Sequence, residues 1–539
     1  MINALKIIQM KTLKKYILIV AVLFLGLGAC TDNFEEINTN PQAFNFIDPG
    51  VQLTKIQLDL SGNREEIWRY ELGICSPMVQ YFAGSWWCQH GGQYNVVEKN
   101  HWFTLWEEMY PRDIKNVVDV IDRTEGDEFY QNTRAAARIL KVYMFSKLTD
   151  LYGDVPYFDA AKGSTDRIFQ PKYDKQEDIY ADFFLELDEA VKDLDAQKEG
   201  VRGDIMYNGD VEKWKRFGNS LRMRLGFRLE KVNPTEAERQ VKAAIEGGVM
   251  ESNDHMCKVQ HMNFDYVKGE NRGNGRAQVF HASDDSEGYR LTNTFVDHLK
   301  ATNDPRLFIY GGTYLSVAGR EYGQDISEYL QMGITHGAMW WNEWSDYGDL
   351  EDEDGNYIAY VDHGHKHMMP SKYVADFKAP FFHMTYAEVE LLLAEAALRD
   401  WGSTGATAHY EKAIIASMAH CALYPGAPVI SDDVVEAYIA ANPLPTTSPE
   451  DMIAIHDQMW VNLYMDGVES YCSFRRSGYP ELVPFESVEW YSSGTGGVIP
   501  RRFFYPEFEA INNPESYQEA IDRMGGTDDW LSRVWWDKN

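Results

Sequence analysis

A mainly α-helical fold with long irregular loops and little β-structure is predicted by three features of the sequence. Apolar residues recur at helical spacing in several segments, most clearly over residues 179–194. One such pattern ends at Gly153, which is followed by a helix-breaking residue, Pro156. Between residues 251 and 379, glycine, asparagine, aspartate and aromatic residues crowd together without periodicity, as is typical of functional loops.

Four amphipathic stripes account for the helical prediction, taken in chain order. Their apolar positions are Ala136, Ile139, Leu140 and Tyr143; Ile179, Phe183, Leu187, Ala190, Val191 and Leu194; Tyr386, Val389, Leu393, Ala396 and Ala397; and Tyr410, Ala413, Ile414 and Met418. Short turns between paired helices, such as residues 402–405, indicate stacked helical hairpins of the tetratricopeptide kind, although no fixed repeat period is present. We expect a helical scaffold at 49–250 and 380–539, interrupted by a loop-rich insertion at 251–379.

The N-terminus has the pattern of an export signal. Lysines precede an uncharged stretch, residues 16–29, that is too short to cross about 30 Å of hydrocarbon with stable flanks. The stretch ends in small residues followed by Cys30, as in bacterial lipoproteins, whose thiol is acylated and becomes the mature N-terminus. We expect a signal peptide at 1–29 and an acylated tether at 30–48. The alternative is an ordinary cleaved signal with a chance cysteine.

Composition limits the classes of partner and chemistry. A net charge of −32 opposes the phosphate backbone, so nucleic acid is not an expected partner. If Cys30 is acylated, five of the six cysteines remain, and none form a C-x-x-C pair, so neither a disulfide framework nor a zinc site is indicated. The sequence also lacks a G-x-S-x-G elbow, an H-E-x-x-H pair and a phosphate-binding glycine loop.

Two segments of the insertion contain residue types that bind metal ions in other proteins. Residues 352–356 resemble a calcium loop, but aligning Gly355 to the turn places Leu350 and Val361 where ligands are needed. His363, His365 and His367 alternate as they would on one face of a strand, without an acid or cysteine at a recognised metal spacing. We therefore expect no metal or cofactor, a solvated acidic turn at residues 352–356 and a hydrogen-bonding or surface role for these histidines. A looser structural calcium site at the acidic turn is the alternative.

Two aromatic clusters are the candidate ligand-binding residues. The first has Trp86 and Trp87 near Asn95, and the second has Trp340, Trp341 and Trp344 around Asn342. Exposed aromatic faces pack against the C–H faces of sugar rings, while neighbouring amides and carboxylates bond the hydroxyl groups. The clusters therefore predict an oligosaccharide-binding surface. The alternative is that these tryptophans belong to the hydrophobic core.

Ten short stretches, taken in order along the chain, form a recognisable set: residues 34–41, 151–157, 171–174, 207–210, 304–306, 385–389, 475–480, 500–502, 505–506 and 534–536. Together they resemble the SusD/RagB family of outer-membrane nutrient-binding lipoproteins, in particular its second branch. The resemblance implies four tetratricopeptide-like hairpins and a non-catalytic protein without a cofactor. It places the ligand near Trp86, Trp87 and residues 340–344. The shared Arg475 and Arg476 we expect to be buried partners of acidic side chains.

The function implied by this resemblance is capture of a glycan at the cell surface. Such proteins are held on the outer membrane by lipid, here through Cys30, and deliver their ligand to a SusC-like TonB-dependent barrel. Three alternatives remain open at this point: an extracytoplasmic glycoside hydrolase acting through paired acids, a peptide-binding member of the same family, and a helical-repeat adaptor without a ligand.

Overall fold

The computed structural model describes residues 47–268, 270–281, 288–318, 321–343, 348–362, 365–485 and 492–538. Pro49–Asn539 make up one compact unit of the chain. The predicted signal peptide and Cys30 lie outside the described residues. Among the helices in the described ranges, none is both long and apolar enough to cross a membrane.

The predicted mainly helical fold is confirmed. The N-terminal helices are α3 (Pro49–Leu60), α4 (Arg64–Glu66), η1 (Ile67–Cys75), α5 (Ser76–Met78), η2 (Trp86–Cys88), α6 (Gln89–Gly92), η3 (Lys99–Phe103), α7 (Thr104–Glu108), η4 (Met109–Ile114), α8 (Lys115–Arg123), η5 (Glu128–Tyr130), α9 (Gln131–Tyr152), α10 (Gln176–Asp193), α11 (Val211–Arg228) and α12 (Pro234–Gly247). The C-terminal helices are α16 (Tyr386–Leu398), α17 (Ala406–His420), η7 (Cys421–Leu423), α18 (Asp432–Ala441), α19 (Glu450–Asn462), α20 (Gly467–Ser477), α21 (Glu509–Asn512) and α22 (Pro514–Arg523).

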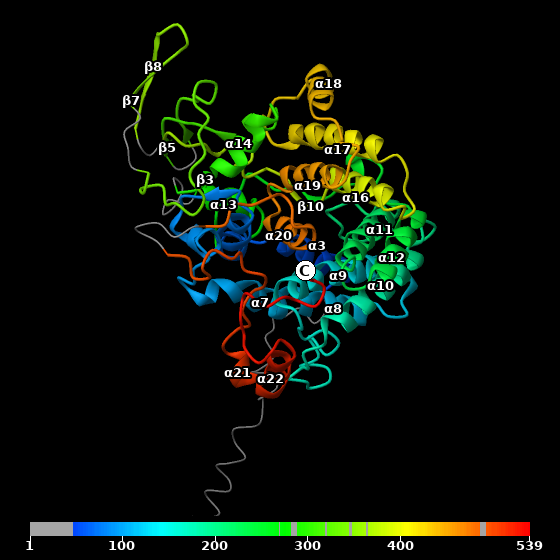
Figure 1. Ribbon diagram of the computed structural model, residues 1–539. Coiled ribbons are helices and arrows are strands. Elements are labelled where there is room, and N and C mark those ends of the chain that lie inside the picture. The colour runs from blue at the N-terminus through cyan, green and yellow to red at the C-terminus, as the bar shows by residue number, and fades with distance from the viewer. Residues whose placement is uncertain are drawn as a thin grey trace, which may run out of the picture. The chain divides into compact units, whose positions relative to one another are not determined.

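Neighbouring helices pack as hairpins. Helix α9 packs against α10, α11 against α12 and α16 against α17, and α16 also contacts α11 and α19. Figure 1 shows α9 to α12 and α16, α17 and α19 gathered on one side of the unit, away from strands β7 and β8. The first and last parts of the chain therefore share one helical stack.

Local sequence explains where these helices begin and end. The side chain of Asp210 caps α11 by accepting from Lys213 N (3.1 Å), and Thr385 caps α16 by accepting from Glu388 N (3.1 Å). Helix α9 ends where predicted, at Gly153, whose φ of 89° is strained for other residues and whose N–H donates to Thr149 O at 2.8 Å.

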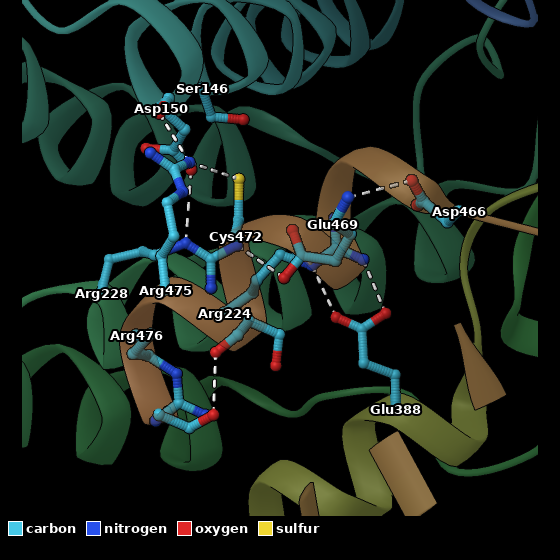
Figure 2. Close-up of polar contacts among 12 residues, drawn as sticks. Ser146, Asp150, Arg224, Arg228, Glu388, Asp466, Glu469, Cys472, Arg475 and Arg476 are labelled. Atoms are coloured by element: carbon cyan, nitrogen blue, oxygen red, sulfur yellow. Dashed lines mark hydrogen bonds and ion pairs between the residues drawn. The ribbon is translucent and has the colours of Figure 1, made fainter. Parts of the chain in front are cut away.

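A buried ionic network joins the helices of the stack (Figure 2). Arg224 of α11 donates twice to Glu388 of α16, both bonds at 2.6 Å. Arg228, one turn further on, donates to Glu469 of α20 at 2.6 Å and to Asp150 of α9 at 3.3 Å. Because both arginines, Glu388 and Asp150 are buried, loss of one partner would leave an uncompensated charge inside the stack.

The two arginines of α20 differ from each other in their partners. Arg476 donates to Glu395 through two bonds of 2.8 Å, which confirms the expected buried partnership with an acid. Arg475 instead donates to two backbone carbonyls, those of Asp150 and Arg501, each at 2.7 Å. The expectation of an acidic partner is therefore corrected for Arg475, since carbonyl oxygens of two segments satisfy its guanidinium.

The middle of the chain contains short helices and small sheets. The helices are η6 (Asn253–His255), α13 (Gly275–Phe280), α14 (Asn293–Ala301) and α15 (Leu307–Tyr310). The described strands pair antiparallel in twos: β1 (Phe82–Ala83) with β3 (Arg290–Leu291), β2 (Cys257–Val259) with β10 (Phe381–Met384), β4 (Gly311–Gly312) with β9 (Met369–Pro370), β5 (Val317–Ala318) with β6 (Glu321–Tyr322), and β7 (Gly348–Glu351) with β8 (Tyr357–Val361). Pairing of β1 with β3 ties the early chain to the insertion, with Phe82 opposite Leu291.

Candidate functional site

Two segments that are far apart in sequence meet at Gly84. Its N–H donates to Ala338 O at 2.8 Å, and its carbonyl accepts from Trp340 N at 3.0 Å. Gly84 has a φ of 90°, and a Cβ at this position would overlap the carbonyl oxygen of Gly288. Only glycine fits here without strain, so the contact between the early loop and the insertion depends on this residue.

This contact brings together the two predicted tryptophan clusters. The rings of Trp86 and Trp341 are stacked, with centroids 6.3 Å apart and planes inclined by 20°. Trp86 is 45% exposed, whereas Trp341 and Trp340 are half-buried. Trp340 meets Trp341 edge-on at 5.5 Å. The result is an indole pair at the surface, supported from the side by a third indole.

Trp86 is held by short-range contacts in its own loop. Ser85 caps the short helix η2 by accepting from Trp87 N at 3.3 Å, and Gln89 donates from its side chain to Trp86 O at 2.8 Å. These bonds fix the backbone on both sides of Trp86 and so limit the positions of its ring. The conformational entropy that the ring loses when a ligand binds is therefore small.

Trp87 and Asn95 lie apart from the stacked pair. Trp87 is half-buried and turns to Trp68, with centroids 4.6 Å apart, and to His101 at 5.0 Å. Asn95 is half-buried in the loop between α6 and η3. The structure thus brings Trp86, but not Trp87, into contact with the second cluster.

Asn342 and Glu343 shape the loop that carries Trp341. The side-chain oxygen of Asn342 accepts from Met339 N at 2.9 Å, and its backbone N–H donates to Met339 O at 2.9 Å. Glu343 Oε1 accepts from Thr335 N at 3.0 Å, and Glu343 Oε2 lies 2.9 Å from His367 Nε2. These bonds close residues 335–343 into a fixed loop.

The electrostatics of Glu343 follow from the same contacts. Burial by itself would raise its pKa, but the hydrogen bonds from His367 and Thr335 outweigh burial and lower the pKa to about 2. Burial lowers the pKa of His367, whose Nε2 lies 2.9 Å from Glu343 Oε2. The partners of Glu343 could not be predicted from the sequence, because Thr335 and His367 lie at positions that no local pattern relates to it.

Other predicted residues have simpler surroundings. Trp344 and His363 lie outside the described residues. His365 Nδ1 lies 2.7 Å from Asp362 Oδ1, whereas His367 faces Glu343, so these two histidines have different partners. Among the residues that the structure describes, no cluster of three histidine, cysteine or acidic side chains is arranged to hold a metal ion.

The acidic turn and the cysteines also have structural explanations. Asp352 Oδ1 accepts from the backbone N–H groups of Asp354 (3.0 Å) and Asn356 (2.7 Å), which makes residues 352–356 a side-chain-capped turn between β7 and β8. Cys75 and Cys88 are buried, as are the other cysteines in the described ranges, and no disulfide joins any two of them.

Comparisons with known proteins agree with this architecture. Residues 41–506 match the model of a SusD-like family described as starch-binding and associating with the outer membrane. A solved structure described as a chitin-binding protein is 35% identical, with a TM-score of 0.79, and the match covers 91% of this chain and 100% of that one. A SusD-like protein from Bacteroidetes is 30% identical, with a TM-score of 0.83 and coverage of 92% and 100%.

A more distant structure shows the fold alone. It is a chitin-binding SusD homologue from Flavobacterium johnsoniae, 24% identical, with a TM-score of 0.72 and coverage of 91% of this chain and 99% of that one. No curated protein is similar to this chain. The family match over most of the length, together with the two structures at 35% and 30% identity, shows that this chain belongs to the SusD-like family.

Proposed function

We propose that this protein is a surface lipoprotein of the outer membrane that binds an oligosaccharide on the Trp86–Trp341 pair and delivers it to a SusC-like TonB-dependent transporter. The observation that carries the proposal is the stacked indole pair itself, with one ring 45% exposed. The acylated Cys30 is the proposed membrane anchor. The description of the related family as associating with the outer membrane supports this location.

An indole pair at the surface suits a sugar chain. Indole faces pack against the C–H groups of pyranose rings, and each ring contributes about 0.5–1.5 kcal/mol beyond area burial. A few such contacts give micromolar to millimolar affinity, which allows a captured ligand to be released to a transporter. The 35% identical chitin-binding protein makes β-1,4-linked N-acetylglucosamine oligomers the first ligands to test.

Binding without turnover is the proposed activity. A glycoside hydrolase needs a general acid that is still protonated near neutral pH. Glu343 is the carboxylic acid on the loop of Trp341, and its pKa of about 2 keeps it ionised at neutral pH. Its oxygens are also engaged with Thr335 and His367. Glu343 is therefore suited to holding the loop and unsuited to donating a proton.

The test is affinity electrophoresis of the purified protein in gels containing soluble polysaccharides. Trp86→Ala and Trp341→Ala should abolish retardation in the gel that retards the wild type, while the melting temperature changes little. Phe169→Ala, which removes an aromatic side chain that is 78% exposed elsewhere, is the matched control and should keep full retardation. Unchanged retardation of both tryptophan variants would refute the proposed site.

Transport requires a second measurement. If the protein works with a barrel transporter, it should copurify from outer membranes with a TonB-dependent barrel protein, and deletion of its gene should slow growth on the bound glycan. Release of reducing ends from the same glycan by the purified protein would instead favour a hydrolase.

A further inference from the structure

A recess lies beside residues 335–343, here called the tryptophan loop. It has a volume of about 410 Å³ and opens between the start of α14, the first residues of the tryptophan loop and the segment 483–485. This size is within the range of pockets that hold small ligands. The residues that line it include Asn293, Thr294, Asp297, Thr335, His336 and Phe485.

One loop contributes residues both to the recess and to the indole pair. Asn293 N donates to Ile334 O at 2.7 Å, and Ile334 N donates to Leu291 O at 2.9 Å, which fixes the loop to β3 and α14. Thr335 follows directly and is bonded through its N–H to Glu343, at the other end of the loop. The same short loop therefore lines the recess with its first residues and carries Trp341 near its end.

The polar lining includes a buried group without a partner. His336 is only 6% exposed, and its Nδ1 has no hydrogen-bond partner among the residues that the structure describes. Its Nε2 lies 3.4 Å from the hydroxyl of Tyr94. Burial lowers the pKa of His336, so the ring is neutral at physiological pH. The buried ring of His336 therefore forms part of the wall of the recess and does not supply an exposed donor.

The remaining lining is of mixed chemistry. Asn293 uses its side-chain oxygen to accept from Thr294 N at 2.9 Å, which orients the amide so that its NH₂ group is the end available as a donor. Asp297 is exposed and supplies an acceptor. Phe485 is buried against Gly337 and supplies an apolar wall. Donor, acceptor and apolar surface thus occur together within one small recess.

We propose that this recess takes the acetamido group of an N-acetylated sugar in the chain that stacks on Trp86 and Trp341. An acetamide presents a carbonyl acceptor, an N–H donor and a methyl group. Asn293 is placed to bond the carbonyl, Asp297 to accept from the N–H, and Phe485 to contact the methyl. A sugar with a hydroxyl at this position cannot supply all three contacts and leaves part of the lining without a partner, which is the basis of discrimination.

This inference rests on the proposed function, and the experiment separates the two. Chitohexaose and cellohexaose share the same β-1,4 backbone and differ only in the acetamido group, so calorimetric titration of the purified protein with each isolates that group. The wild type should bind chitohexaose at least about tenfold more tightly, as expected when polar groups in a pocket lose their partners. Asn293→Leu and Asp297→Ala should each remove most of this preference.

Controls make each outcome decisive. Asn512→Leu, the same change at an exposed asparagine on α21, should leave both affinities unchanged. Near-ultraviolet circular dichroism of all variants should match the wild type. Equal affinity for the two hexaoses, with both lost in Trp341→Ala, would overturn the acetamido recess and leave the proposed function standing. Failure to bind either hexaose would overturn the recess, and failure on the wider polysaccharide panel as well would overturn the proposed function.

Discussion

Replacing Gly84 with alanine should pull apart the two halves of the indole pair. Gly84 has a φ of 90°, and the added Cβ would overlap the backbone oxygen of Gly288 and approach Arg290 Cγ to 3.1 Å. A backbone oxygen cannot rotate away as a flexible side chain can. The strand-like contact of Gly84 with Ala338 and Trp340 is therefore the part of the structure that must yield.

The size of the effect can be worked from these contacts. A non-glycine residue at such a φ costs about 1–3 kcal/mol. Loss of the backbone bonds from Gly84 to Ala338 and Trp340 removes about 0.5–1.5 kcal/mol each. The free energy of unfolding should thus fall by about 2–6 kcal/mol if strain and bond loss both occur. Without the stacked arrangement of Trp86 and Trp341, glycan affinity should fall about tenfold or more.

Gly126→Ala is the control that separates the effect of backbone strain from the effect of displacing a neighbouring segment. Gly126 also has a positive φ, 72°, but a Cβ there would meet nothing within 4 Å, so its substitution carries conformational strain alone. Denaturant unfolding, near-ultraviolet circular dichroism and glycan titration should show a larger loss of stability, and the only loss of binding, in Gly84→Ala. Equal effects of the two substitutions on stability, with intact binding in both, would refute the role assigned to Gly84.

Three further outcomes are expected. Glu388→Ala should lower the free energy of unfolding by about 3–5 kcal/mol, because the buried guanidinium of Arg224 loses its bidentate partner; a change under about 1 kcal/mol in denaturant unfolding would contradict the network. His90 is buried and its pKa is lowered by burial to about 4, so stability present above pH 6.5 should be lost as the pH falls towards 4, by up to about 3 kcal/mol. Burial lowers the pKa of other histidines too, among them His101 and His336, so His90→Phe should reduce the total loss by about that amount without abolishing it, and an unchanged profile would contradict this. Cys30→Ala should move the protein from the membrane to the soluble fraction on cell fractionation, whereas continued membrane retention would contradict the lipid anchor.

Periodicity was sufficient to predict the scaffold. The apolar stripe from Ile179 to Leu194 corresponds to α10, and the stop after Tyr152 is found at Gly153 with a positive φ. These features are local, since the spacing of apolar residues and the conformation of a glycine depend on the nearest few positions.

Contacts between segments that are distant in sequence could not be predicted from these local patterns. Sequence reasoning treated Trp86 and Trp87 as equivalent, yet η2 directs one to Trp341 and the other to Trp68. It expected an acid beside Arg475, where the structure has carbonyl groups. In each case the decisive partner comes from another part of the chain, and many arrangements of partners are compatible with the same local sequence.

The divided origin of the indole pair also affects how binding preference can be engineered or exchanged between relatives. A graft of residues 334–343 into another scaffold would transfer Trp341 without the ring it rests on, and a graft of residues 84–89 would transfer only Trp86. Recombination that keeps both segments from one parent preserves the pair. A crossover between the segments combines one tryptophan of this protein with whatever residue the other parent has at the second position. Chimeras of this protein should therefore retain glycan binding on the indole pair only when both segments are transferred together.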